Sequence, residues 1–199
     1  MTTPGTESAP VQFAHLWDGS RCIRCSACIV ACAQTNFPEL LNTENAGWET
    51  LPANTRWETL FEDGPDAPKI LVQCQECGEA ACIAACPYRC NYRDEKTGLV
   101  KIDPTACVGC GLCVTMCPYD LRWMHPVTRR PVKCMGEGCE KRLAAGLEPA
   151  CVAICSTGAR AFGNSADPAS DFSERLRRSG AERLLPEEGT EPNFYVVMP

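Results

Sequence analysis

The sequence has few of the side chains on which catalytic and nucleic-acid-binding sites depend. Only two of its 199 residues are histidines, His15 and His125, and neither has a carboxylate and a nucleophile beside it. The net charge is −6, and no stripe of basic residues with interleaved aromatics occurs. Because nucleic-acid-binding surfaces are basic, we expect no nucleic-acid partner. We also expect packing or surface roles for the two histidines, and no catalytic residue.

The sequence also lacks a long apolar run. A transmembrane helix needs about 20 predominantly apolar residues, and no stretch of the sequence approaches that length. We therefore predict no direct membrane insertion. Residues 1–19 are polar and have neither the basic start nor the apolar segment of a secretion signal. We therefore expect a reducing compartment, in which the cysteines stay reduced.

Cysteine, by contrast, is abundant. The sequence has 17 cysteines, and in a small secreted protein such a number would indicate a disulfide framework. Sixteen of them fall into four groups of four, and every group ends in Cys-x-x-x-Cys. The groups are, in sequence order, Cys22, Cys25, Cys28 and Cys32; Cys74, Cys77, Cys82 and Cys86; Cys107, Cys110, Cys113 and Cys117; and Cys134, Cys139, Cys151 and Cys155. This tight grouping favours metal ligands over disulfides.

The most informative group runs from Cys107 to Cys117 and is followed by Pro118. Its gaps of two, two and three residues are those of bacterial ferredoxins, in which three cysteines hold one [4Fe–4S] cluster and the fourth binds a second cluster. The group that begins at Cys22 has the same spacing, with Ala33 in place of the proline. Structural zinc sites instead pair two Cys-x-x-Cys motifs, often with histidine, which leaves the compact groups unexplained. We therefore predict four [4Fe–4S] clusters with sixteen cysteine ligands.

Cys90 is the one cysteine outside the four groups. It follows Cys86 by four residues, and a free cysteine is most simply a small buried apolar side chain. The alternative is that Cys90 replaces Cys86 as a ligand. Against this alternative, Cys86-Pro87 keeps the Cys-Pro pair of the ferredoxin pattern.

Turn-forming residues divide the rest of the sequence into short elements. Gly98 suits the turn of a hairpin, and Ser26 is placed to cap a helix. Residues 33–69 contain no cysteine, and we expect an ordered excursion over the surface. In it, Trp48 and Trp57 either anchor the segment to the protein itself or contact a partner subunit. The expected helices are 27–34, 140–147 and 171–185, and the expected strands are 70–73, 91–93, 99–102, 159–162 and 194–197.

The order and spacing of the four groups resemble one known family over residues 13–198. The sequence is similar to the four-cluster iron–sulfur subunits of molybdopterin oxidoreductases of the dimethyl sulfoxide reductase and polysulfide or thiosulfate reductase type. Stretches that resemble the polysulfide reductase branch are Cys117–Asp120, Pro149–Val152, Thr157–Arg160 and Leu185–Thr190. The sequence departs from the family at Ser156, where proline is usual, and at Tyr88-Arg89-Cys90, where Thr-Gly-Ala is usual.

The resemblance implies that the last cysteine of each group serves a cluster held by another group. The implied ligand sets are Cys22, Cys25, Cys28 and Cys155; Cys32, Cys134, Cys139 and Cys151; Cys74, Cys77, Cys82 and Cys117; and Cys86, Cys107, Cys110 and Cys113. In nitrate reductase-type relatives the position of Cys110 holds tryptophan and the cluster is [3Fe–4S]. The cysteine at this position therefore implies that all four clusters are [4Fe–4S].

The resemblance also implies an α+β fold, in which two bacterial-ferredoxin-like units for two [4Fe–4S] clusters each are interlocked, one inserted in the other. Short strands, short helices and long loops are expected throughout. The expected boundaries are a flexible tail at 1–12, an outer unit at 13–35 plus 134–163, a surface excursion at 36–69, an inner unit with its linker at 70–133, and a C-terminal tail at 164–199 that packs against the core or a partner.

The function implied by the resemblance is that of a non-catalytic electron-transfer subunit. Its expected partners are a molybdopterin catalytic subunit and an integral membrane anchor that interacts with quinone. The expected location is peripheral, on the extracytoplasmic face of the membrane after export with a partner that carries a twin-arginine signal; the alternative is the cytoplasm. The alternative functions are the iron–sulfur subunit of a hydrogenase or formate dehydrogenase-type complex, and a freely diffusing polyferredoxin.

Overall fold

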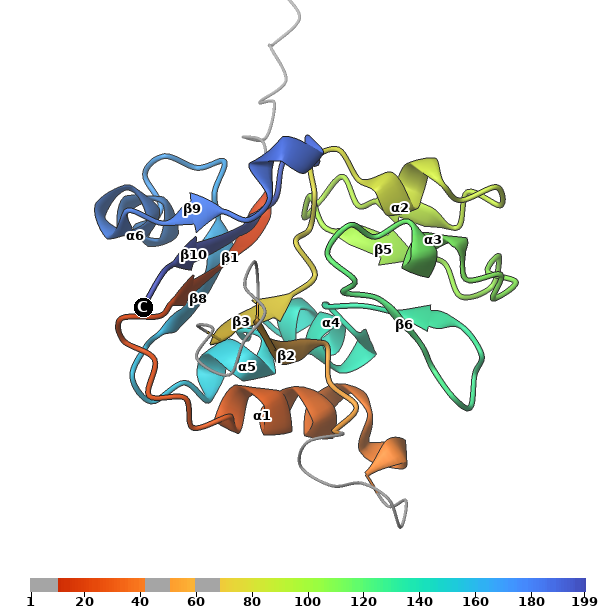
Figure 1. Cartoon of the computed structure of the whole chain (residues 1–199), viewed down its shortest axis with the longest axis horizontal. Helices are drawn as coiled ribbons and strands as arrows, with labels where there is room; N and C mark the ends of the chain where they lie inside the picture. Colours follow the sequence, from red (N-terminus) through yellow and green to blue (C-terminus); the bar gives the residue numbers. More distant parts are fainter. Residues whose placement is uncertain (1–10, 42–50, 60–68) are drawn as a thin grey trace, which may run out of the picture.

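A four-stranded sheet joins the two ends of the protein in the computed structural model, which describes residues 11–41, 51–59 and 69–199. The strand order is β8-β1-β10-β9 (Figure 1). Strand β1 pairs in parallel with β10 and antiparallel with β8. The strands are β1 (Phe13–Asp18), β8 (Arg160–Asn164), β9 (Glu182–Arg183) and β10 (Phe194–Val197). The terminal strand predicted at 194–197 is confirmed and lies inside this sheet.

Helix α6 (Asp171–Ser179) packs beside strand β8. The Ser170 side chain caps its first turn by accepting a hydrogen bond from the backbone N–H of Ser173 at 3.1 Å, and Phe172 packs in a small core with Ala14 and Leu16 of β1. The helix ends earlier than predicted because Gly180 adopts a left-handed conformation, with φ 64°. Glu182 and Arg183, which were predicted in the helix, form β9 instead.

The largest core joins distant parts of the sequence. Trp17 and Phe194 from the terminal sheet pack in it with Ile70 and Leu71. The latter two belong to β3 (Lys69–Gln73), which confirms the predicted strand and pairs antiparallel with β2 (Thr55–Thr59). Trp57 of β2 meets Trp17 edge to face, with ring centroids 6.1 Å apart. Trp57 therefore anchors its segment to the protein itself, whereas Trp48 lies outside the described residues.

Helix α1 (Ala27–Asn36) contacts α4 (Glu137–Ala144) and α5 (Ala150–Ala153), and the short 3₁₀ helix η1 (Pro38–Leu40) follows it (Figure 1). The predicted helices here are confirmed, although α4 begins three residues early. The predicted cap is wrong, because the Ser26 side chain accepts no hydrogen bond from the helix. Its hydroxyl accepts one from Trp57 Nε1 at 3.0 Å instead.

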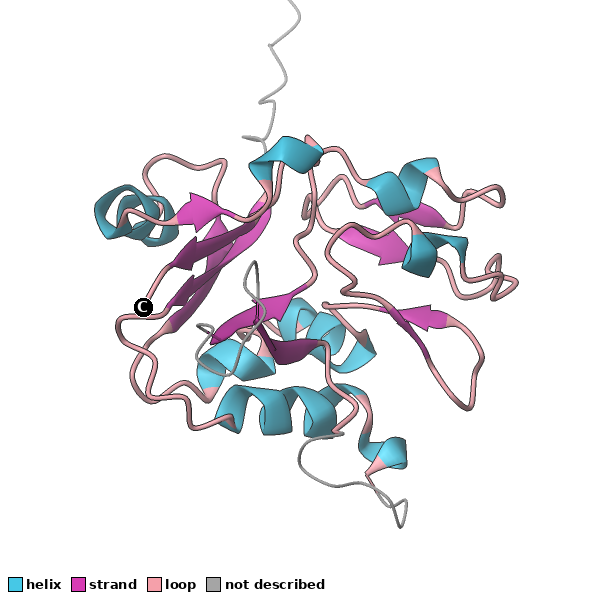
Figure 2. Cartoon of the chain, in the orientation of Figure 1, coloured by secondary structure: helices cyan, strands magenta, loops and turns pink. Residues whose placement is uncertain are grey.

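Two hairpins and two short helices form the part of the molecule farthest from α6 (Figure 2). The hairpins are β4 (Asn91–Arg93) with β5 (Val100–Ile102), and β6 (Trp123–Met124) with β7 (Pro131–Val132). The helices α2 (Ala81–Ala84) and α3 (Leu112–Thr115) contact each other. The first hairpin is as predicted, with Gly98 at φ 70° in its turn. The mixture of short helices and strands agrees with the predicted α+β class.

The N-terminal segment is bonded to this hairpin. The backbone N–H of Phe13 donates to the Thr97 carbonyl at 2.9 Å, and Gln12 Nε2 donates to the Gly98 carbonyl at 3.2 Å. Gln12, which was predicted as part of a tail, also bonds to Asn164 through its backbone N–H. Residues 1–10 of that tail lie outside the described residues. Within the described ranges, no helix combines the length and apolar character that crossing a membrane requires.

Candidate metal centres

Three small cavities are each lined by four of the predicted ligand cysteines. In every case three cysteines come from one sequence group and the fourth from another. The sets are Cys22, Cys25, Cys28 and Cys155, called site 1; Cys32, Cys134, Cys139 and Cys151, called site 2; and Cys86, Cys107, Cys110 and Cys113, called site 4. The empty volumes are 360 Å³ for site 1 and 280 Å³ for each of the other two. The fold thus brings together thiols that are far apart in the sequence.

The remaining four cysteines, called site 3, are Cys74, Cys77, Cys82 and Cys117. Their side chains are close enough to interact. Burial, together with negative charge on Cys82 and Cys117, raises the pKa of Cys77 to about 11. The Arg122 guanidinium interacts with both Cys82 and Cys74. Twelve of the sixteen predicted ligands therefore line three cavities, and electrostatic interactions link the other four.

Left-handed backbone conformations curl the cysteine loops tightly around these sites. In the first group, Arg24 and Ser26 have φ values of 55° and 59°. The equivalent positions of the third group are Gly109 and Gly111, at 73° and 80°. A side chain at Gly109 would also overlap the backbone carbonyl of Arg129. Glycine is thus required there, whereas non-glycine residues tolerate the same turn at some strain in the first group.

Each Cys-x-x-x-Cys segment connects two sites. Helix α1 carries Cys28 and Cys32 one turn apart, and the first lines site 1 while the second lines site 2. The segments that begin in α2, α3 and α5 repeat this arrangement. Residues i and i+4 lie one above the other on the same face of a helix, so the two thiols of each segment are one turn apart and reach neighbouring sites.

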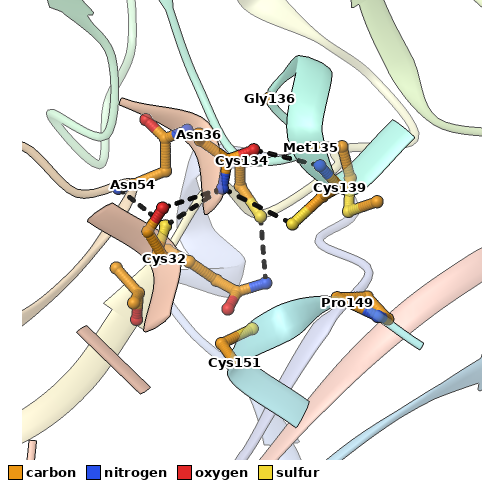
Figure 3. A pocket seen from close by; sticks show the side chains of 11 residues that line it. Cys32, Asn36, Asn54, Cys134, Met135, Gly136, Cys139, Pro149 and Cys151 are labelled. Carbon is orange, nitrogen blue, oxygen red and sulfur yellow. Dashed lines mark hydrogen bonds between the residues drawn. The ribbon is translucent and has the colours of Figure 1, made fainter. Parts of the chain in front are cut away.

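Amide groups point at the sulfurs of site 2 (Figure 3). The backbone N–H of Asn54 donates to Cys32 Sγ at 3.3 Å. The Asn36 side-chain amide lies 3.6 Å from Cys32 Sγ and 3.5 Å from Cys139 Sγ, and Gln73 Nε2 lies 3.4 Å from Cys134 Sγ. Burial raises the pKa of Cys32 to about 12. These donors therefore stabilise negative sulfur where solvent does not reach it.

Arg122 lies between sites 3 and 4. Its side chain is 2% exposed, and Nη2 donates to Cys82 Sγ at 3.0 Å. Nη1 donates to Asn91 Oδ1 at 2.8 Å, and the guanidinium also interacts electrostatically with Cys113 of site 4. A buried cation thus interacts with sulfurs of two different sites.

Arg160 occupies the corresponding place between sites 1 and 2. It is buried and bonds to Thr55 Oγ1 at 3.0 Å and to the Gln73 side chain. It also interacts electrostatically with Cys28 of site 1 and Cys151 of site 2. Both arginines follow the last cysteine of their group by five residues. This repeated spacing could have identified them from the sequence, although the spacing of the metal ligands alone did not.

A buried ion pair lies where the two halves of the cysteine arrangement meet. Lys133 Nζ is 2.6 Å from Glu76 Oε1, with both side chains almost inaccessible to solvent. The Glu76 Oε2 atom accepts from the backbone N–H of Val100 at 2.7 Å, and Lys133 donates to the Cys134 carbonyl at 2.6 Å. Cys74 of site 3 and Cys134 of site 2 belong to the same core cluster. The pair therefore lies beside both sites.

The two histidines have no place in sites 1, 2 or 4. His15 is fully buried against Phe162, and its burial lowers its pKa well below the usual value. His125 Nε2 lies 3.0 Å from Glu39 Oε1, and the imidazole ring stacks on Trp123. Both side chains pack within the protein.

The donor chemistry of the four sites fits an iron–sulfur cluster. Each set offers four cysteine sulfurs, the ligands that such clusters use. Because burial raises the pKa of thiols such as Cys32 and Cys77, these groups are protonated when free, and a metal must displace the protons on binding. The nearby N–H donors and the two buried arginines then offset the negative charge of the thiolates.

Comparison with known proteins shows similarity to iron–sulfur proteins. The family described as "4Fe-4S dicluster domain" matches residues 70–165, which include sites 3 and 4 and part of site 2. The sequence also aligns with whole proteins. It is 35% identical to "Protein NrfC" of Escherichia coli over 94% of its own length and 81% of that protein. It is 33% identical to a subunit of the polysulfide reductase of Wolinella succinogenes, over 94% of each protein.

A third relative is "Thiosulfate reductase electron transfer subunit PhsB" of Salmonella typhi, 38% identical over 76% of each protein. The chain therefore belongs to the iron–sulfur subunit family that includes these proteins, as its cysteine pattern predicted. It is an electron-transfer protein with [4Fe–4S] centres of the ferredoxin type.

Proposed function

We propose that the protein carries single electrons through four [4Fe–4S] clusters, one at each of sites 1 to 4. When bound, the clusters supply the one-electron redox chemistry. The observation that carries this proposal is the convergence of cysteines from two sequence groups on each of three cavities. The proposal includes the interlocked arrangement of the two units. It is supported by the cysteines of sites 1 and 2, which come from both ends of the cysteine-containing region and enclose the segment with the cysteines of sites 3 and 4.

The residues around the sites have defined tasks in this function. Sixteen cysteines hold the clusters at fixed positions; seven of these residues are buried, seven are partly buried, and Cys25 and Cys110 are exposed. Arg122 would stabilise the extra negative charge of reduced clusters at sites 3 and 4, and Arg160 would do the same at sites 1 and 2. No side chain is assigned to substrate chemistry, so the protein acts as a relay and not as an enzyme by itself.

The partners that suit such a relay are a molybdopterin catalytic subunit and a quinone-interacting membrane anchor. The names of the relatives support this choice, since they include subunits of polysulfide and thiosulfate reductases. The protein would lie at the periphery of the membrane, on the extracytoplasmic face if a twin-arginine-bearing partner exports it. A hydrogenase or formate dehydrogenase-type complex could use the same relay. Affinity purification of the complex and identification of the bound large subunit distinguishes these assignments.

The cluster assignment predicts the metal content of the protein and of two alanine variants. Protein purified without oxygen should contain about sixteen irons and as many acid-labile sulfides, since each cubane holds four of both. Cys117→Ala should remove about four irons, because site 3 loses a ligand. Thr105→Ala, an exposed substitution, serves as the control and should leave the iron content unchanged. Stoichiometric zinc without sulfide in the native protein would refute the proposal.

A further inference from the structure

Site 4 contains a fifth thiol. Cys90 Sγ lies 3.2 Å from Cys86 Sγ, and Cys90 lines the same cavity as the four cysteines of the site. Cys90 is 4% exposed, and Cys107 lines the cavity beside it. The cavities of sites 1 and 2 are lined by four cysteines each. Site 4 therefore differs from them in its sulfur environment.

The backbone holds the Cys90 thiol in this position. The Cys90 carbonyl accepts a hydrogen bond from the backbone N–H of Asp103 at 2.7 Å. The next residue, Asn91, begins strand β4 and accepts from the buried Arg122 guanidinium. With fixed contacts on its own carbonyl and on the following side chain, Cys90 has little freedom to turn its thiol away from Cys86.

The protein contains an internal counterpart that lacks this thiol. Cys86-Pro87-Tyr88 and Cys117-Pro118-Tyr119 repeat in sequence. The following residues, Arg89 and Asp120, share a left-handed backbone, with φ values of 52° and 49°. Leu121 then stands where the first repeat has Cys90. Its backbone N–H lies 3.5 Å from Cys117 Sγ, just as Cys86 receives a hydrogen bond from the backbone of Cys90. The two positions thus differ chiefly in the side chain.

The protonation states of the two sulfurs decide which of them donates the hydrogen bond. A cysteine that binds iron is deprotonated and can only accept a hydrogen bond. Cys90 is then the donor. Hydrogen bonds to ligand sulfurs stabilise the more negative, reduced state of an iron–sulfur cluster and so raise its reduction potential.

We propose that Cys90 donates an S–H···S hydrogen bond to the Cys86 thiolate and raises the reduction potential of the cluster at site 4. Cys90 is a positioning and tuning residue, and Cys86 remains the ligand. This inference rests on the proposed function, because it requires a cluster at site 4.

The test is a redox titration of the purified complex, followed by electron paramagnetic resonance. A Cys110→Ser variant identifies the transition of site 4, because it changes a ligand of that site alone. Cys90→Ala should shift this transition to lower potential and leave the iron and sulfide contents of the protein unchanged. Cys90→Ser keeps a hydrogen-bond donor and should recover part of the shift.

The counterpart position supplies a gain-of-function control. Leu121→Cys places a thiol beside Cys117 and should raise the potential of site 3 relative to Leu121→Ala, which opens the same space without a donor. If Leu121→Cys does not fold, the comparison of Cys90→Ala with Cys90→Ser still decides the question.

Two outcomes would overturn the inference. One is an unchanged potential of site 4 in Cys90→Ala. The other is loss of about four irons in Cys90→Ala together with full iron in Cys86→Ala, which would make Cys90 the ligand. A native protein without sixteen irons and sulfides would instead count against the proposed function, so the two failures are distinguishable.

Discussion

Replacing Arg122 with glutamine should lower the reduction potentials of sites 3 and 4, that of site 3 by about 100 mV. At an effective dielectric constant of about 20, a unit charge at about 7 Å contributes about 2 kcal/mol, and for a one-electron couple about 1.4 kcal/mol corresponds to about 59 mV. Arg122 is almost fully buried and donates to Cys82 Sγ, so water cannot replace its charge. Redox titration of the assembled protein measures the shift.

The controls for this prediction use the repeat within the sequence. Arg122→Lys keeps the charge and should retain most of the potential. Arg160→Gln should shift sites 1 and 2 instead, because Arg160 interacts electrostatically with Cys28 and Cys151. An equal shift of all transitions in Arg122→Gln would show a general loss of structure and contradict the local electrostatic explanation, as would no shift at all.

The ligand cysteines were predictable because their chemistry imposes a spacing on the sequence. In two of the groups, three thiols of one site fall within seven residues and the fourth comes from a separate segment, so the pattern of gaps identifies the residues. The hairpin at Gly98 and the strand at 70–73 followed from similarly local rules. The family resemblance supplied the sets that group the cysteines, and the cavities bring the same residues together at sites 1, 2 and 4.

Residues that act on the sulfurs from other segments were not predictable in this way. Asn54 is 22 residues from Cys32, and Gln73 is 61 residues from Cys134. An amide side chain has no preferred sequence distance from a thiol, so only the folded protein shows the contact. Ser26 was misread for a related reason. The cysteine loop places it in a left-handed turn at φ 59°, and its hydroxyl then faces Trp57 and not the helix.

Removing Glu76 should destabilise the protein by about 3–5 kcal/mol, the usual cost of breaking one side of a buried ion pair. In Glu76→Ala the Lys133 ammonium keeps, among the described residues, only the Cys134 carbonyl as a hydrogen-bond acceptor, and the backbone N–H of Val100 loses its acceptor. Both groups lie where solvent cannot compensate. We expect the midpoint of urea denaturation, followed under anaerobic conditions by loss of cluster absorbance, to fall clearly below that of the native protein.

The surface of helix α4 offers a matched control for this pair. Glu137 and Lys141 are also 2.6 Å apart, but their side chains are 79% and 74% exposed. An exposed helical pair of this kind contributes about 0.2–0.5 kcal/mol, so Glu137→Ala should leave the midpoint nearly unchanged. The double variant Glu76→Gln, Lys133→Met removes both buried charges and should recover much of the loss. Equal effects of Glu76→Ala and Glu137→Ala would show that burial of the Lys133 charge does not limit stability. The two ion pairs have the same 2.6 Å separation, but one is buried and the other is exposed. The difference between their stability losses therefore measures the cost of an unpaired buried charge between sites 2 and 3.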